Sequence, residues 1–165
     1  MGMVSGHDYW MAHAISLAHK GYYSTHPNPR VGCVIVADGK LIAEGFHEYP
    51  GGPHAEVYAL RRAGAQARGA DLYVTLEPCS HHGKTPPCVD RVIESGIRRV
   101  FIGQIDPNPL VKGRGVRRLR AAGLEVVTGI LRSECTELNA AINKHVTTGL
   151  PLVTLKAAMT LDGRI

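Results

Sequence analysis

Between residues 71 and 128 the sequence alternates between short segments with strand character and segments with helical character. Strand character is found at residues 72–76, 99–103 and 124–128, and helical character at residues 88–95 and 115–122. Gly96 and Gly123 follow the two helical segments, where a glycine readily ends a helix. Strands separated by helices pair in parallel, and the connecting helices cover the faces of the sheet. The alternation therefore predicts an α/β fold.

The N-terminal half adds an antiparallel pair of strands. Residues 31–37 and 40–46 have strand character, and the dipeptide Asp38-Gly39 between them is typical of a two-residue hairpin. Apolar periodicity and capping residues predict the remaining helices at residues 8–20, 54–63 and 133–147. We expect a three-layer α/β/α sandwich with a mixed sheet.

The composition is that of a globular protein. Of the 165 residues, 44% are hydrophobic and 20% are charged, which excludes a wholly disordered chain. No apolar stretch approaches the roughly 20 residues of a membrane-spanning helix. The first residues also lack the pattern of a secretory signal peptide. We therefore expect a cytoplasmic protein without a membrane partner.

The C-terminal segment differs from the rest of the chain. Residues 152–157 again have strand character, but the sequence ends at Ile165 with nothing that could cover another strand. We expect residues 1–150 to form one domain, and residues 151–165 to be the start of a second domain that is truncated.

Basic residues are concentrated in one stretch, from Arg98 to Arg120. This stretch holds seven Lys or Arg residues and one acid, Asp106, so its charge is +6 against +5 for the whole chain. Such a stretch is typical of a protein with an anionic partner, either a phosphate or a nucleic acid. A solvated helix face explains it equally well.

Four residues combine metal-ligand and acid–base chemistry: His54, Glu56, Cys79 and Cys88. One histidine and two cysteines can supply the three protein ligands of a catalytic zinc ion, leaving a fourth position for water. His54 and Cys88 lie at predicted helix starts, where the helix dipole favours the thiolate that zinc requires. Glu56 can stand beside the water and move protons. Cobalt or iron would accept similar ligands.

Other interpretations of these residues are open at this stage. His81 or His82 could complete a structural zinc site with four protein ligands, or the two cysteines could form a disulfide. A non-catalytic, zinc-stabilised module could bind RNA through its basic residues, but it would have no use for Glu56. Cys33 and Cys135 lie in apolar or helical segments and are expected to be buried thiols.

The joint pattern is close to that of zinc-dependent base deaminases, whose signature is H-x-E followed by P-C-x-x-C. Here eight residues rather than two separate Cys79 from Cys88. A deaminase acting on tRNA or single-stranded DNA is the alternative enzyme, because it would use the same metal chemistry. Only two Phe and one Trp are available to stack on bases, although six Tyr are present.

Five segments are similar to motifs of one enzyme family: T-H-P-N-P-R-V-G at 25–32, P-H-A-E at 53–56, Y-V-T-L-E-P-C-S-H-H-G-K-T-P-P-C at 73–88, D-P-N-P at 106–109 and G-R-G at 113–115. From about Asp8 to its end, the chain resembles the deaminase domain of the bifunctional riboflavin-biosynthesis family RibD, which has a cytidine-deaminase-like fold. The long loop between the two cysteines is this family's form of the deaminase signature.

The resemblance implies hydrolytic deamination of 2,5-diamino-6-ribosylamino-4(3H)-pyrimidinone 5′-phosphate, in which the amino group at C2 leaves as ammonia. It implies one Zn²⁺ per chain, held by His54, Cys79 and Cys88, with Glu56 as the catalytic residue. It also implies that the protein forms a homo-oligomer. The expected binding partner is this small phosphorylated pyrimidine and not a nucleic acid.

The same resemblance supplies the candidate substrate-binding residues, which are Asn28, His47, His81 and Lys84. His47 follows a strand and could instead only cap its end. Lys84 is the stronger candidate for binding a phosphate. A positively charged lysine between two zinc-binding cysteines is electrostatically unfavourable unless an anion lies nearby. Residues 152–164 are similar to the first strand and turn of the family's reductase domain. NADPH is therefore expected only where the rest of that domain is present.

Overall fold

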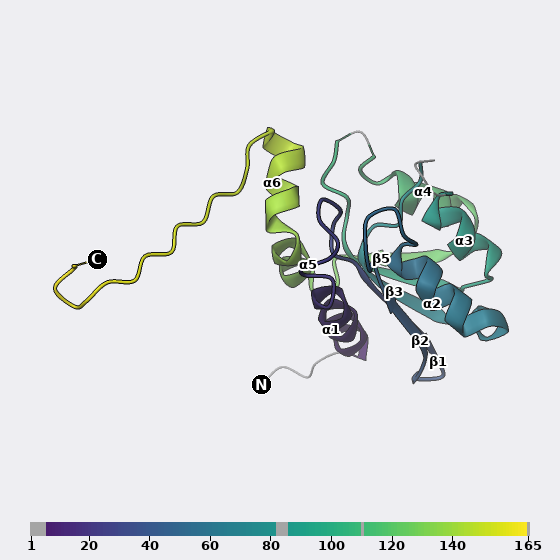
Figure 1. Ribbon diagram of the computed structural model, residues 1–165. Coiled ribbons are helices and arrows are strands. Elements are labelled where there is room, and N and C mark those ends of the chain that lie inside the picture. Colours follow the sequence, from purple (N-terminus) through teal and green to yellow (C-terminus); the bar gives the residue numbers. More distant parts are fainter. Residues whose placement is uncertain (1–5, 82–85, 110, 165) are drawn as a thin grey trace.

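The computed structural model describes residues 6–81, 86–109 and 111–164, and it contains a five-stranded mixed sheet in the order β2-β1-β3-β4-β5 (Figure 1). β1 is antiparallel to both β2 and β3, whereas β3, β4 and β5 are parallel. The strands are β1 (Gly32–Ala37), β2 (Lys40–Phe46), β3 (Asp71–Leu76), β4 (Arg99–Gln104) and β5 (Glu125–Thr128). The predicted hairpin is confirmed, and Asp38 and Gly39 both have positive φ, at 51° and 69°.

Helices cover both faces of the sheet, so the predicted three-layer arrangement is confirmed (Figure 1). One layer contains α1 and α5, and the other contains α2, α3 and α4. The helices are α1 (Gly6–His19), α2 (Ala55–Ala63), α3 (Cys88–Glu94), α4 (Arg114–Ala121), α5 (Arg132–Leu138) and α6 (Ala140–Thr148), with a short 3₁₀ turn at Gly64–Ala67.

Each strand of the sheet's centre contributes side chains to two separate cores. In β1, Cys33 and Ile35 face α2 and α3, whereas Val34 and Val36 face α1. This burial on both faces explains why the central strands are continuous apolar runs rather than alternating ones. Cys33 and Cys135 are buried thiols, as predicted.

The helix predicted at residues 133–147 is divided in two by Asn139. The side chain of Asn139 is 4% exposed, and its amide pairs with the backbone of Arg30, accepting from the N–H at 2.8 Å and donating to the carbonyl at 2.9 Å. Asn139 takes up a non-helical conformation with φ −120° and ψ 28°. The first half, α5, begins at Arg132, one residue before the predicted start, and its N-cap is Leu131.

The strand predicted at residues 152–157 is wrong as well. This segment has no helix or strand in the structure, and residues 149–164 are all exposed. A strand needs a neighbouring strand to satisfy its backbone hydrogen bonds, and Figure 1 shows this segment extending away from the sheet. No helix among the described residues is long and apolar enough to cross a membrane.

Two glycines let helices approach the sheet closely. A Cβ atom on Gly32 would lie 1.9 Å from the carbonyl oxygen of Ala14 in α1. A Cβ atom on Gly45 would lie 2.7 Å from the carbonyl oxygen of Ala55, at the start of α2. Because these contacts are with backbone atoms, no side-chain rotation can relieve them.

We expect Gly32→Ala to lower the free energy of unfolding by about 1–3 kcal/mol, because α1 must move away from β1 to admit a methyl group. Urea unfolding followed by circular dichroism measures this loss. Gly6→Ala is the matched control, because a Cβ atom there meets nothing within 4 Å. A Gly32→Ala protein as stable as the Gly6→Ala protein would contradict the proposed close packing.

Candidate active site

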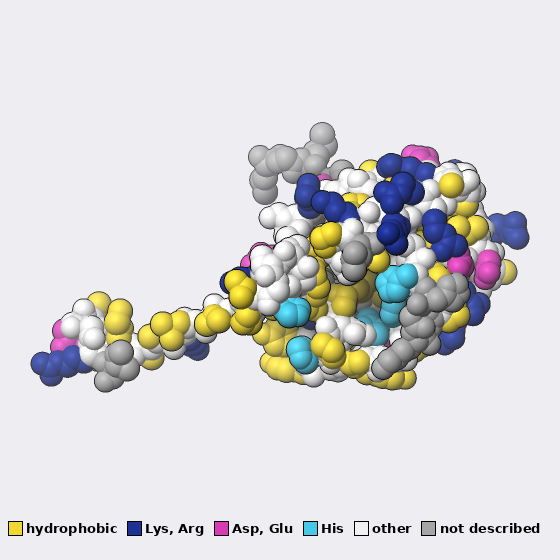
Figure 2. Space-filling view, turned by 90° about the horizontal axis from the view of Figure 1, so that it is seen from above, with side chains coloured by type: hydrophobic (Ala, Val, Ile, Leu, Met, Phe, Trp, Pro, Cys, Tyr) yellow, Lys and Arg dark blue, Asp and Glu magenta, His cyan; other side chains and the backbone are white. Residues whose placement is uncertain are grey.

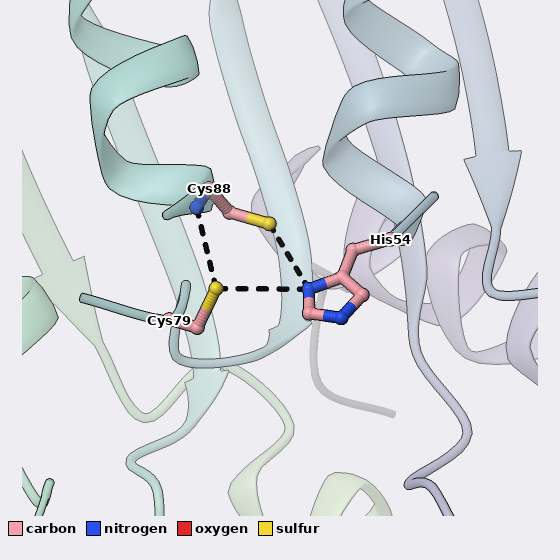
Figure 3. Close-up of side chains that lie close together, drawn as sticks. All are labelled: His54, Cys79 and Cys88. Atoms are coloured by element: carbon pink, nitrogen blue, oxygen red, sulfur yellow. Dashed lines mark hydrogen bonds between the residues drawn. The ribbon is translucent and has the colours of Figure 1, made fainter. Parts of the chain in front are cut away.

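The three predicted metal ligands meet at the edge of the sheet where β3 ends. His54 is the N-cap of α2, and Cys88 is the first residue of α3. Cys79 lies on the loop that leaves β3, and its backbone carbonyl accepts a hydrogen bond from the N–H of Val89 at 3.2 Å. Figure 3 shows that the three side chains point toward one another from these separate segments.

The spacing of the three ligand atoms fits a tetrahedral metal ion. His54 Nδ1 lies 3.1 Å from Cys88 Sγ and 3.6 Å from Cys79 Sγ, and all three atoms lie within 4.8 Å of one another. Zinc bonded to sulfur at about 2.3 Å and to nitrogen at about 2.0 Å places such atoms about 3.5 Å apart. Two sulfurs and one nitrogen also form a donor set that zinc prefers.

Hydrogen bonds and helix geometry favour a thiolate at Cys79. Its pKa is lowered to about 4, first by hydrogen bonding to the Cys88 thiol and then by His54. The backbone N–H of Cys88 also donates to Cys79 Sγ at 3.2 Å, as expected at a helix N-terminus. The pKa of Cys88 is raised, because it shares its proton with Cys79 and is buried. A divalent cation between the two sulfurs favours loss of this second proton.

Glu56 lies beside the three ligands, as the sequence predicted. Its side chain is 3% exposed and lines the same pocket as His54 and Cys79. Burial raises the pKa of this carboxyl group, and the positive charge of His54 partly opposes the effect. A buried carboxyl group next to a metal site is suited to hold and release protons.

The pocket that opens onto these residues has a volume of about 270 Å³. Asn28 and His47 line it together, and the Asn28 side-chain amide donates to His47 Nε2 at 3.0 Å. His47 Nδ1 in turn donates to the carbonyl oxygen of Pro53 at 3.0 Å. These two bonds select the neutral ring, and burial lowers the pKa of His47. His47 therefore does more than cap a strand, since it orients Asn28 in the pocket.

The structure brings His81 into the pocket, whereas Lys84 and His82 lie outside the described residues. Within the part of the chain that the structure describes, the metal-ligand group contains His54, Cys79 and Cys88 but not His81. Among the described residues, this grouping therefore does not support His81 as a fourth protein ligand.

Sequence reasoning missed two acidic residues of the site, Glu77 and Asp106, which both line the pocket. Glu77 is 5% exposed, and its carboxylate accepts backbone N–H bonds from Asp106 at 3.0 Å, Gly113 at 2.9 Å and Val116 at 3.1 Å. It thereby ties the loop after β3 to the loop after β4 and to the start of α4. The sequence held one signal for Glu77: it follows directly after a buried strand and precedes Pro78-Cys79.

The basic stretch from Arg98 to Arg120 does not form one surface. Arg98 and Arg99 lie at the starting end of β4, where both pair with Asp71. Arg114, Arg117 and Arg118 instead lie on α4 and line a groove beside Ser80 and His81. Only this second group lies near the candidate active site.

Comparison with known proteins agrees with this geometry. The family described as the cytidine and deoxycytidylate deaminase zinc-binding region matches residues 4–104. The chain is 54% identical over 157 residues to the riboflavin biosynthesis protein RibD of Escherichia coli. That alignment covers 95% of this chain and 43% of the Escherichia coli protein, so the chain spans less than half of this relative.

Solved structures show the same similarity. The structure of Acinetobacter baumannii RibD superimposes with a TM-score of 0.95 at 53% identity, covering 98% of this chain and 45% of that one. A Thermotoga maritima structure is described as a diaminohydroxyphosphoribosylaminopyrimidine deaminase and 5-amino-6-(5-phosphoribosylamino)uracil reductase. It superimposes with a TM-score of 0.91 at 53% identity, covering 96% of this chain and 46% of that one. The group formed by His54, Cys79 and Cys88 thus lies in a zinc-binding deaminase domain.

We expect the purified protein to contain one zinc ion per chain and the Cys79→Ala/Cys88→Ala double variant to contain none, because one imidazole cannot hold the ion alone. Elemental analysis by mass spectrometry measures the stoichiometry. Cys135→Ala is the control, since this thiol is buried in the core on the other face of the sheet, together with side chains of α1. Zinc retained by the double variant, or near-zero zinc in the wild type after zinc-supplemented expression, would contradict the site.

Glu77→Gln is expected to lower the free energy of unfolding by about 1–3 kcal/mol, because the amide NH₂ cannot accept the backbone N–H bonds that one carboxylate oxygen accepts. Chemical denaturation measures this change. The exposed Glu94→Gln is the control, with an expected change within about 0.5 kcal/mol. Equal stabilities of the two variants would show that Glu77 does not hold the loops together.

Proposed function

The chain belongs to the cytidine and deoxycytidylate deaminase zinc-binding family, as a deaminase domain of the RibD type, and from this premise we propose the reaction that it catalyses. The reaction is hydrolytic deamination of 2,5-diamino-6-ribosylamino-4(3H)-pyrimidinone 5′-phosphate, a step of riboflavin biosynthesis. The observation that carries the proposal is the group of His54, Cys79 and Cys88 with the buried Glu56 beside it. His54, Cys79 and Glu56 line one pocket.

In this proposal His54, Cys79 and Cys88 hold the metal ion, and Glu56 carries the protons. Bound zinc supplies Lewis-acid chemistry that makes a water molecule nucleophilic near neutral pH. The Glu56 carboxylate takes the proton that this water loses and delivers it to a ring nitrogen of the substrate. The oxygen of the water bonds to C2 as the ring nitrogen is protonated. Glu56 then takes the second proton from this oxygen and passes it to the amino group at C2, so that the C–N bond breaks, ammonia leaves and a carbonyl group remains. Proton transfer of this kind typically contributes about 10²–10⁴-fold to the rate.

Three polar side chains of the pocket are proposed to orient the pyrimidine ring: Asn28, His47 and His81. The bond from Asn28 to His47 leaves the amide oxygen of Asn28 to accept a hydrogen bond from an amino group of the ring. Because the pocket also encloses His54 and Glu56, a ring held there lies against the metal site. Lys84 stays a proposed phosphate ligand on the basis of the sequence.

We propose a free small molecule as the substrate rather than a nucleic acid. The support is the 53–54% identity to RibD proteins and the division of the basic stretch between two ends of the sheet. A binding site for single-stranded nucleic acid would need a continuous, positively charged groove with aromatic side chains on which bases can stack. A homo-oligomer is part of the same proposal, and NADPH belongs only to the reductase part of longer relatives.

Ammonia release tests the proposed reaction. We expect the protein to release ammonia from the phosphorylated diaminopyrimidine and to leave cytidine, adenosine and tRNA unchanged. The measurement is made at equal substrate concentrations, and the pyrimidine product is identified by mass spectrometry. Efficient formation of inosine in tRNA, with no turnover of the diaminopyrimidine, would overturn the substrate assignment.

Glu56→Gln is expected to keep the zinc ion but to lower kcat by at least about 10²-fold, because Gln preserves the size of the side chain and cannot carry a proton. Steady-state kinetics and zinc content are measured on the same preparation. Glu134→Gln, on the exposed side of α5, is the control and keeps wild-type activity. A Glu56→Gln enzyme with more than about a tenth of the wild-type kcat would require another proton carrier, for which His81 is the first candidate.

A further inference from the structure

The groove beside Ser80 and His81 is a second hollow that adjoins the active-site pocket. It has a volume of about 420 Å³, and it is lined by residues of two segments: Ser80, His81, Arg114, Arg117, Arg118 and Ala121. His81 also lines the pocket that contains the metal ligands, so the two hollows share a wall. Figure 2 shows several Lys and Arg side chains gathered to one side of the histidines on this face of the molecule.

The periodicity of α4 places three of its four arginines on one face. Arg114, Arg117 and Arg118 are spaced by three and four residues and are exposed. Gly115 lies on the buried face, and a Cβ atom there would be 2.3 Å from the carbonyl oxygen of Pro78. This close approach holds the first turn of α4 against the residue that precedes Cys79. The arginines are therefore held beside the segment that carries a metal ligand.

The arginines of this face differ in their partners. Arg118 forms an ion pair with Asp90 and donates to the carbonyl oxygen of Ser80, so it serves to hold the Ser80 segment. The side chains of Arg114 and Arg117 form no ion pair or hydrogen bond with any other residue that the structure describes. The nearby carboxylate of Glu77 is turned inward, where it accepts three backbone N–H bonds.

We propose that Arg114 and Arg117 form a phosphate subsite that binds the 5′-phosphate of the substrate while its pyrimidine ring lies in the pocket beside His54. This inference rests on the proposed function, and it adds two specificity-determining residues. A guanidinium group presents two parallel N–H donors, which match the oxygens of a phosphate monoester. The groove opens beside His81, so a ribose linker can join the two hollows.

The test compares two substrates in the Arg114→Ala/Arg117→Ala double variant. The phosphorylated diaminopyrimidine should show a KM at least about 10-fold higher than with the wild type, as expected for the loss of charge-assisted hydrogen bonds. The dephosphorylated ribosyl analogue should show an unchanged KM and kcat, which also demonstrates that the variant is folded. Arg61→Ala, which replaces an exposed arginine on α2, is the matched control and should leave the KM for both substrates unchanged.

Inorganic phosphate separates binding of the phosphate group from turnover. We expect it to inhibit the wild type competitively, with an inhibition constant that rises in the double variant and not in Arg61→Ala. An equal rise in KM for both substrates would overturn the phosphate subsite while leaving the deaminase assignment intact. Equal inhibition of the wild type, the double variant and Arg61→Ala by phosphate would do the same. If the wild type deaminates neither compound, the proposed function fails and the subsite falls with it.

Discussion

The site depends on the approach of two helix N-termini, those of α2 and α3, at the edge where β3 ends. His54 precedes α2, Cys88 begins α3, and Cys79 lies on the loop between β3 and α3, so the fold brings together ligands 34 positions apart. Gly45 contributes by allowing α2 to lie directly against β2. The same helix start that positions Cys88 also donates a backbone N–H to Cys79, so geometry and charge favour the metal site together.

Buried polar side chains then hold the loops that surround this edge. Asn139 pairs with the backbone of Arg30, and Glu77 accepts N–H groups from the loop after β4 and from α4. Asn28 and His47 form a third such connection, which ends at the carbonyl oxygen of Pro53, next to His54. An unsatisfied polar group in these positions would be costly, so each loop has one preferred position. The pocket is therefore shaped before any substrate binds.

Much of this arrangement is predictable from local sequence signals. Strand–helix alternation predicts the parallel strands, Asp38-Gly39 predicts the hairpin, and the ligand pattern predicts which helix starts must meet. The failures have long-range causes. The break at Asn139 comes from a contact with Arg30, 109 positions away, and the three N–H donors of Glu77 lie 29 to 39 positions further along the chain. No periodicity within one segment can reveal such contacts.

The division of the basic stretch likewise depends on long-range structure. In the sequence Arg98 and Arg117 lie in one cationic run, but β4 separates them, because a strand carries its two ends to opposite edges of a sheet. Arg99 thus pairs with Asp71 at the edge far from the metal ligands, whereas Arg117 reaches the groove beside His81. Charge counted along a sequence predicts an anionic partner only when the fold keeps those charges on one face.

An open, catalytic metal site differs from a closed, structural one in its fourth ligand. X-ray absorption at the zinc edge measures the ligand set of the loaded protein directly. We predict two sulfurs at about 2.3 Å and two lighter atoms at about 2.0 Å, of which one is a histidine nitrogen and the other an exchangeable oxygen. A spectrum with two sulfurs and two histidine nitrogens, unchanged when small anions are added, would show a closed structural site and contradict the account.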